Sequence, residues 1–297
     1  MDFGRVPENQ LKKIDLRLPK EPAENSKVLK GKRKSNPSVY IGCAKWGRKE
    51  WVGKIYPPGT SEKNFLQHYV QHYNSIELNA TTYKMPTPAQ VKSWAEKAGT
   101  KEFIFCPKLV KYIIPNGNLE RELEFTTTYL KAVKEFGKHL GPNFFMLPET
   151  YAPVKKEKLV DYLKSFPSSE PLFVEFRHPG WFSDKKIQKE MFDFLRKFKF
   201  GTIITDTAGR RDCCHMHLTV PKAFVRFVGN SLHSTDYSRL DEWVNLIKIW
   251  IDKGLEELYF FMHMHDEAKS PELTVYLVDK LNKECKLDII RPGFVKS

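Results

Sequence analysis

Charged side chains at alternate positions follow an apolar stretch near the middle of the chain. Leu172, Phe173 and Val174 lead into Glu175 and Arg177. Side chains of a β-strand alternate between two faces, so Glu175 and Arg177 point the same way. Burying such a pair costs free energy of desolvation unless the charges pair or meet a ligand. The pattern therefore predicts either a structural ion pair or the floor of a polar binding site, and we favour the site.

Polar residues end several other apolar stretches in the same way. Carboxylates act as general bases or metal ligands, whereas lysine and arginine bind phosphate and carboxylate groups. Both kinds around one opening indicate a site for an anionic substrate, although they could also merely neutralise one another. We predict proton transfer by Glu77, Glu175 and Asp206. The predicted substrate-binding residues are Trp46, Asn79, Tyr83, Lys108, Arg177, His178, Trp181 and Arg226.

A metal site is a further hypothesis. His263 and His265 lie on one face of a predicted strand and Asp266 follows, and these are ligand types that zinc or manganese accepts. A catalytic metal needs a third protein ligand, so Glu175 or Asp206 would have to converge on the histidines. The alternative is that one histidine forms a hydrogen bond inside the pocket while the other packs or faces solvent.

Short β-rich runs alternate with segments of helical period after residue 37, as expected of parallel βα units. The clearest helix has apolar residues at spacings of three and four from Leu240 to Ile251, and Gly254 is placed to end it. Eight such units predict a (β/α)8 barrel of TIM type, whose site lies at the C-terminal ends of the strands. The predicted strands are Ser38–Cys43, Ser75–Asn79, Phe103–Pro107, Asn143–Leu147, Leu172–Phe176, Thr202–Thr205, Ala223–Phe227 and Glu257–Met262.

Two domain-level predictions follow from composition. Residues 1–37 carry ten lysines and arginines against five acidic residues and show no apolar period, which predicts a disordered basic tail before a barrel domain at 38–297. The formal charge of +13 favours an anionic partner, either a small molecule or nucleic acid. No apolar run is long enough to span a membrane and no secretion signal is visible, so we expect a cytoplasmic protein with reduced cysteines.

Several motifs occur in the order found in one known family. They are Ile41-Gly42 with Trp46, the run 75–79 with Thr82-Tyr83, the run 175–179 with Trp181-Phe182, and the run 224–227 with Gly229. The chain resembles the YecE-like family, catalogued as domain of unknown function seventy-two, from about residue 38 to 282. The resemblance implies a TIM-type barrel and no particular activity. Where the family usually has an aromatic-Asn-Asn-Asp run, this chain has the run 262–266, which holds the two histidines.

Three functions remain open from the sequence. The first is an enzyme, such as a hydrolase, that acts on a phosphate-bearing or other anionic substrate in the polar pocket. The second is a non-catalytic nucleic-acid-binding protein that uses the basic tail, Arg210, Arg211 and exposed aromatic side chains. The third is a glycosidase with paired carboxylates, against which the many basic residues argue.

Overall fold

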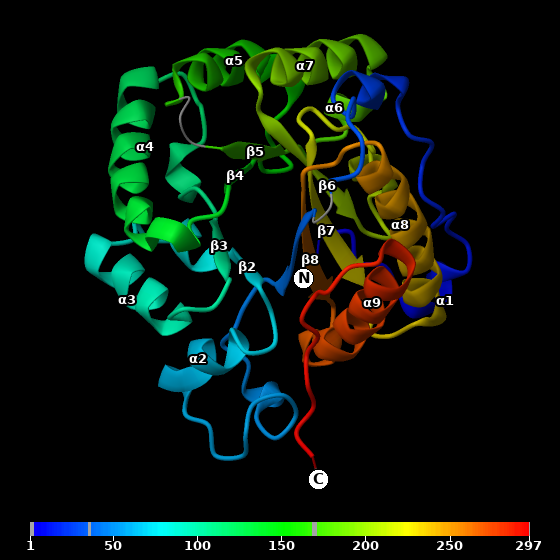
Figure 1. The fold of residues 1–297 in the computed structure, drawn as a ribbon. Helices are drawn as coiled ribbons and strands as arrows, with labels where there is room; N and C mark the ends of the chain where they lie inside the picture. Colours follow the sequence, from blue (N-terminus) through cyan, green and yellow to red (C-terminus); the bar gives the residue numbers. More distant parts are fainter. Residues whose placement is uncertain (1–2, 35–36, 168–170, 297) are drawn as a thin grey trace.

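The strands form a nearly closed barrel with the helices around it (Figure 1). In this computed structural model, residues 3–34, 37–167 and 171–296 are described. The strands are β1 (Ser38–Cys43), β2 (Ser75–Leu78), β3 (Ile104–Pro107), β4 (Asn143–Met146), β5 (Leu172–Glu175), β6 (Gly201–Asp206), β7 (Lys222–Gly229) and β8 (Glu257–Met264). Their order in the sheet is β3-β2-β1-β8-β7-β6-β5-β4, with parallel pairing. Parallel bridges between Phe105 and Leu140 and between Lys108 and Phe144 connect β3 to β4.

The predicted (β/α)8 barrel is confirmed, and the predicted strands agree with the observed ones to within two residues at each end. The largest differences are at the C-terminal ends of β7 and β8. These two strands pair along their whole length, from Lys222 opposite Glu257 to Gly229 opposite Met264. Backbone pairing with each other therefore extends β7 and β8 two residues beyond the ends expected from the apolar pattern.

The inside of the barrel is built in layers. One layer is apolar and consists of Cys106, Phe144, Phe173, Ile203, Phe224, Tyr259 and Phe261. Because strand side chains alternate, the residue two positions further along each strand faces the interior again. That next layer, nearer the C-terminal ends of the strands, consists of Lys108, Met146, Glu175, Thr205, Arg226 and His263. A polar layer therefore lies on an aromatic floor.

The helices cover the outside of the ring. The predicted helix after β7 is confirmed, and it buries the side chains of Leu240, Trp243, Ile247 and Trp250 against the sheet. Among the described residues, no helix combines the length and apolar character needed to cross a membrane. The α-helices are α1 (Glu8–Leu11), α2 (Phe65–Tyr69), α3 (Pro88–Ala98), α4 (Leu119–Val133), α5 (Lys156–Ser165), α6 (Gly180–Ser183), α7 (Lys185–Phe198), α8 (Ser234–Asp252) and α9 (Ser270–Cys285).

The N-terminal segment, residues 3–34, differs from the disordered tail expected from its composition. It contains α1 and runs along α8 (Figure 1), where the amide of Leu18 donates to Glu242 at 2.7 Å. The side chain of Asn25 is buried and exchanges hydrogen bonds with the backbone of Met216 and Leu218 at 2.9 and 2.8 Å. Isolated apolar residues at irregular spacing are buried against the barrel, so the segment is ordered without showing a helical or strand period.

Candidate functional site

Arg226 on β7 is the centre of the polar layer. Its Nε and one terminal nitrogen, Nη2, donate to the two carboxylate oxygens of Glu77 on β2 at 2.8 and 2.9 Å. The other terminal nitrogen, Nη1, donates to both oxygens of Glu175 on β5 at 2.9 Å. All five guanidinium donors point along fixed directions, which makes arginine suited to joining two carboxylates. Arg226 therefore connects opposite sides of the barrel.

Each carboxylate has further partners. Glu175 accepts from Nε of Arg177 at 2.9 Å and from the hydroxyl of Thr205 on β6 at 2.7 Å. Glu77 accepts from the side-chain amide of Asn79 at 2.8 Å, and Nε2 of His263 on β8 lies 2.9 Å from it. Because a carboxylate accepts about four hydrogen bonds, both groups are close to saturated by the protein itself. We call Glu77, Lys108, Glu175, Arg177, Arg226 and His263 the mouth cluster.

The fields of the neighbouring cations set the charge state of the two carboxylates. Burial would raise the pKa of Glu175, but Arg177 and Arg226 outweigh burial and lower this pKa from 4.5 to about 2. Burial acts on Glu77 in the same sense, and Arg226 and His263 hold its pKa well below the ordinary value. Both groups are therefore carboxylates at neutral pH, and the guanidinium of Arg226 has a raised pKa because both of them face it.

Lys108 differs from the other cations because it has no acidic partner. Its Nζ contacts Sδ of Met146 at 3.4 Å and lies 5.9 Å from the centre of the Phe144 ring. No carboxylate of the described residues lies within ion-pair distance of this nitrogen. Burial, and then the charge of Arg226, lower the pKa of Lys108 from 10.5 to about 8. About a tenth of the side chains are therefore neutral amines at pH 7.

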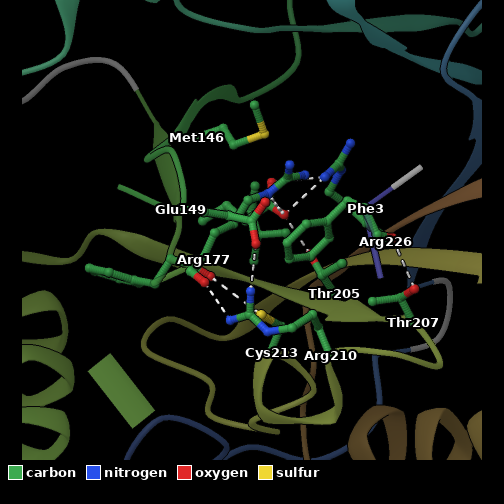
Figure 2. A network of polar contacts seen from close by, with 12 residues as sticks. Phe3, Met146, Glu149, Arg177, Thr205, Thr207, Arg210, Cys213 and Arg226 are labelled. Carbon is green, nitrogen blue, oxygen red and sulfur yellow. Dashed lines mark hydrogen bonds and ion pairs between the residues drawn. The ribbon is translucent and has the colours of Figure 1, made fainter. Parts of the chain in front are cut away.

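Arg177 forms the outer part of the mouth cluster (Figure 2). One of its terminal nitrogens, Nη2, is buried and has no hydrogen-bond partner. The ring of Phe3 covers the guanidinium, 4.1 Å from its carbon to the ring centre. The carbonyl of Arg177 accepts from Arg210, whose guanidinium also binds Glu149 at 2.9 Å and Asp212 at 2.8 Å. The mouth thus presents a buried donor that the described part of the protein does not use.

The structure brings together six residues that the sequence assigned to the site, namely Glu77, Asn79, Lys108, Glu175, Arg177 and Arg226. Asp206 is not among them. It follows Thr205 on β6 and so faces outward, where Trp243 donates to it at 2.8 Å and Arg239 forms an ion pair at 2.9 Å. Its prediction as a proton-transfer group is corrected: Asp206 fastens β6 to α8.

The predicted metal site is not formed either. In the parts of the chain that the structure describes, three or more His, Cys, Asp or Glu side chains nowhere gather in a way that could hold a metal ion. His263 faces the interior and contacts Glu77, whereas the carboxylate of Asp266 accepts from the amide of Ala268 at 3.2 Å beyond the strand. The sequence pattern is misleading because the chain turns after Met264, so the three residues do not converge.

The remaining predicted binding residues lie outside the cluster. Trp181 is buried and donates to the carbonyl of Tyr151 at 2.8 Å, and Trp46 packs edge-on against Trp94. His178 accepts from the amide of Gly180 at 3.0 Å, which stabilises the turn after β5. Tyr83 is the exception, since 74% of its surface is exposed. Of these four, Tyr83 is the most exposed, Trp46 and His178 are partly exposed, and Trp181 is buried.

Three neighbours of the cluster were missed from the sequence. Thr205 is one position before the residue that was chosen, and strict alternation along β6 from Ile203 would have identified it. Met146 was not considered, although it lies opposite Glu175 in the register of β4 and β5. Phe3 gave no signal, because nothing in its local sequence shows that it returns to the barrel.

The fold and the cluster define a (β/α)8 barrel with a charged, mostly buried layer at the C-terminal mouth. The family model described as "Protein of unknown function DUF72" matches residues 40–292, and the chain belongs to this family. This confirms the resemblance found from the motifs.

Individual relatives agree with this assignment. The UPF0759 protein YecE of Escherichia coli K12 is 27% identical over 82% of this chain and 93% of its own length. The UPF0759 protein YunF of Bacillus subtilis is 27% identical over 49% of this chain and 52% of its own length. A crystal structure of a DUF72 family protein from Enterococcus faecalis is 15% identical, covers 87% of this chain and all of its own, and has a TM-score of 0.63. The structural likeness supports the barrel fold.

Proposed function

We propose that this protein is an enzyme that acts on an anionic small molecule at the barrel mouth. The observation that carries the proposal is that the carboxylates of the mouth cluster have their full set of hydrogen-bond donors, whereas two of its cations still have donors to offer. Glu77 and Glu175 are saturated by Arg226 and its neighbours, whereas Lys108 has no acidic partner and Arg177 keeps an unused donor. An anion that accepts from Arg177 and lies near Lys108 would complete this arrangement, because buried donors are rarely left unpaired.

The two cations would have different roles. Arg177 is held by Glu175, so it offers a fixed donor for binding. Lys108 has a pKa of about 8, close to the pH of most cells, which suits a group that gives up or takes a proton during reaction. In a phosphoester hydrolase, water would attack phosphorus and release a proton to solvent, and the bond from phosphorus to the ester oxygen would break. Lys108 would protonate that leaving oxygen while Arg177 binds the phosphate. Hydrolysis of phosphoesters is therefore the first reaction to test.

The low pKa values of both carboxylates bear on the glycosidase alternative. A glycosidase needs one carboxylic acid that keeps its proton near neutral pH. Arg226 holds the pKa of Glu77 and of Glu175 below the ordinary value, so neither supplies such an acid. The geometry supports proton transfer by Lys108 instead.

Activity should be screened with p-nitrophenyl phosphate and a panel of phosphorylated metabolites. The proposal predicts activity that falls as the pH rises through about 8, because a general acid must be protonated. Lys108→Met should abolish it, and Arg177→Met should weaken the affinity for inorganic phosphate by about tenfold. Lys111→Met, which changes an exposed lysine one turn further on, is the matched control. Unchanged activity and phosphate affinity in both site variants would refute the proposal.

Nucleic-acid binding stays a prediction from the overall charge. Two of the groups expected to carry it are engaged in ion pairs: Arg210 binds Glu149 and Asp212, and Arg211 binds Asp206. A filter-binding titration at low salt tests the prediction. Retention of single-stranded or duplex nucleic acid that falls steeply with added salt would support it.

A further inference from the structure

The mouth cluster is almost closed to solvent. Lys108 and Arg177 are 7% and 9% exposed, and Arg226 is 3% exposed. Two cavities of about 800 and 590 Å3 are described, and none of the residues of the mouth cluster lines either of them. Neither of these two cavities therefore leads to Lys108.

The side chain of Phe3 lies beside Arg177 and Arg210 at this mouth (Figure 2). The Phe3 ring stacks on the guanidinium of Arg177 at 4.1 Å and is 5.3 Å from that of Arg210. The carbonyl of Gly4 accepts from the amide of Gly209 at 2.8 Å, and the hydroxyl of Thr207 lies 3.2 Å from the same carbonyl. Both contacts come from the loop between β6 and β7, so the segment is attached to one side of the mouth.

The contact depends on two glycines. Gly4 has a φ of +67°, and a Cβ at this position would lie 2.4 Å from Cγ2 of Thr207. A Cβ at Gly209 would lie 2.8 Å from the carbonyl oxygen of Gly4. The close approach is therefore built into the sequence, since side chains at either position would force the segment away.

We propose that Phe3 is a movable closing residue of the site, which leaves Arg177 to admit a ligand and then covers it again. Phe3 occupies the face of the guanidinium, whereas the unused donor Nη2 is on its edge. A ligand bound to the edge is therefore compatible with Phe3 on the face. The carbonyl of Phe3 also accepts from the hydroxyl of Thr207 at 3.2 Å, and its side chain packs against the apolar core, so these contacts would have to break and re-form as the lid opens and closes.

Acetylation of Lys108 by acetic anhydride measures access to the site directly. The neutral amine attacks the anhydride, acetate leaves, and peptide mass spectrometry gives the rate for each lysine. A pH profile separates two effects: the midpoint reports the pKa of Lys108, and the plateau at high pH reports access. Because the reagent is uncharged, the result does not depend on whether the protein binds anions, so failure of the lid is distinguishable from failure of the proposed function.

Phe3→Ala should raise the plateau rate of Lys108 about tenfold, the change expected for loss of a cation–π contact of ordinary strength. Gly4→Ala should do the same by a different route, because its Cβ collides with Thr207. Lys111 in the same samples is the internal control, and Phe198→Ala, which alters a phenylalanine that is 40% exposed on α7, is the matched variant. A plateau within twofold of the original in either Phe3→Ala or Gly4→Ala overturns the proposal.

Discussion

Replacing Lys108 with methionine should make the protein more stable at pH 7. Folding lowers the pKa of Lys108 from 10.5 to about 8 because the ammonium group is buried. A depressed lysine pKa means that protonation opposes folding, at about 1.4 kcal/mol for each pH unit. The shift of about 2.5 units therefore costs roughly 2 to 4 kcal/mol at pH 7. Methionine removes this cost and still packs against Met146 and Phe144.

The pH dependence distinguishes this mechanism from better packing. As the pH rises from about 8 to 10.5, Lys108 loses its proton in the folded and then in the unfolded state, so the cost disappears. The advantage of Lys108→Met in urea unfolding should shrink over this range, whereas Lys111→Met should stay within about 0.5 kcal/mol of the original protein throughout. An advantage that is the same at pH 7 and pH 10.5, or a loss of stability at pH 7, would refute the reasoning.

Three other changes test the arrangement of charges. Arg226→Met should cost about 3 to 5 kcal/mol in urea unfolding at pH 7, because Glu77 and Glu175 stay buried without their main partner; a cost below 1 kcal/mol would contradict the geometry. Asp206→Asn should lower stability by about 2 to 4 kcal/mol, because Arg239 loses its ion pair, yet leave phosphate affinity within twofold in calorimetry; a clear loss of affinity would place Asp206 in the site after all. The pKa of Glu175 is depressed to about 2, so its stabilisation is present above pH 4.5 and disappears as the pH falls from there to about 2. In Glu175→Gln the free energy of unfolding should therefore fall less steeply with decreasing pH below 4.5. An unchanged dependence on pH would argue against the ion pairs.

Much of the fold could be predicted because parallel strands buried on both faces give apolar runs that are easy to recognise. Ser38–Cys43 was predicted with the observed limits. The long helix α8 was equally clear, since its buried stripe repeats over five turns. The N-terminal segment was misjudged for the opposite reason. Its order depends on separate contacts, such as those of Asn25 with Met216 and Leu218, which no local period records.

The candidate site was predicted in part, and alternation explains where it failed. Glu175 and Arg226 were found because each is a charged residue near the end of an apolar stretch, and in the structure each lies two positions after an interior phenylalanine, Phe173 or Phe224. Asp206 was wrongly added because a carboxylate at a strand end looks the same whether it faces the barrel or a helix. Its ion pair with Arg239 on α8 is a contact between residues far apart in the sequence, and a single sequence does not show it.

The mouth cluster combines two kinds of charged group with different consequences. Glu77, Glu175 and Arg226 pair with one another through hydrogen bonds, so this network of charges can form without any ligand. Burying this network costs desolvation free energy, and hydrophobic residues of similar volume would stabilise the fold as well or better. The network does, however, hold Arg177 through Glu175. It also places the charge of Arg226 near Lys108, where this charge adds to burial in lowering the pKa of the amine. A network that holds one cation in place and lowers the pKa of another would suit the binding and proton transfer that we propose for this mouth.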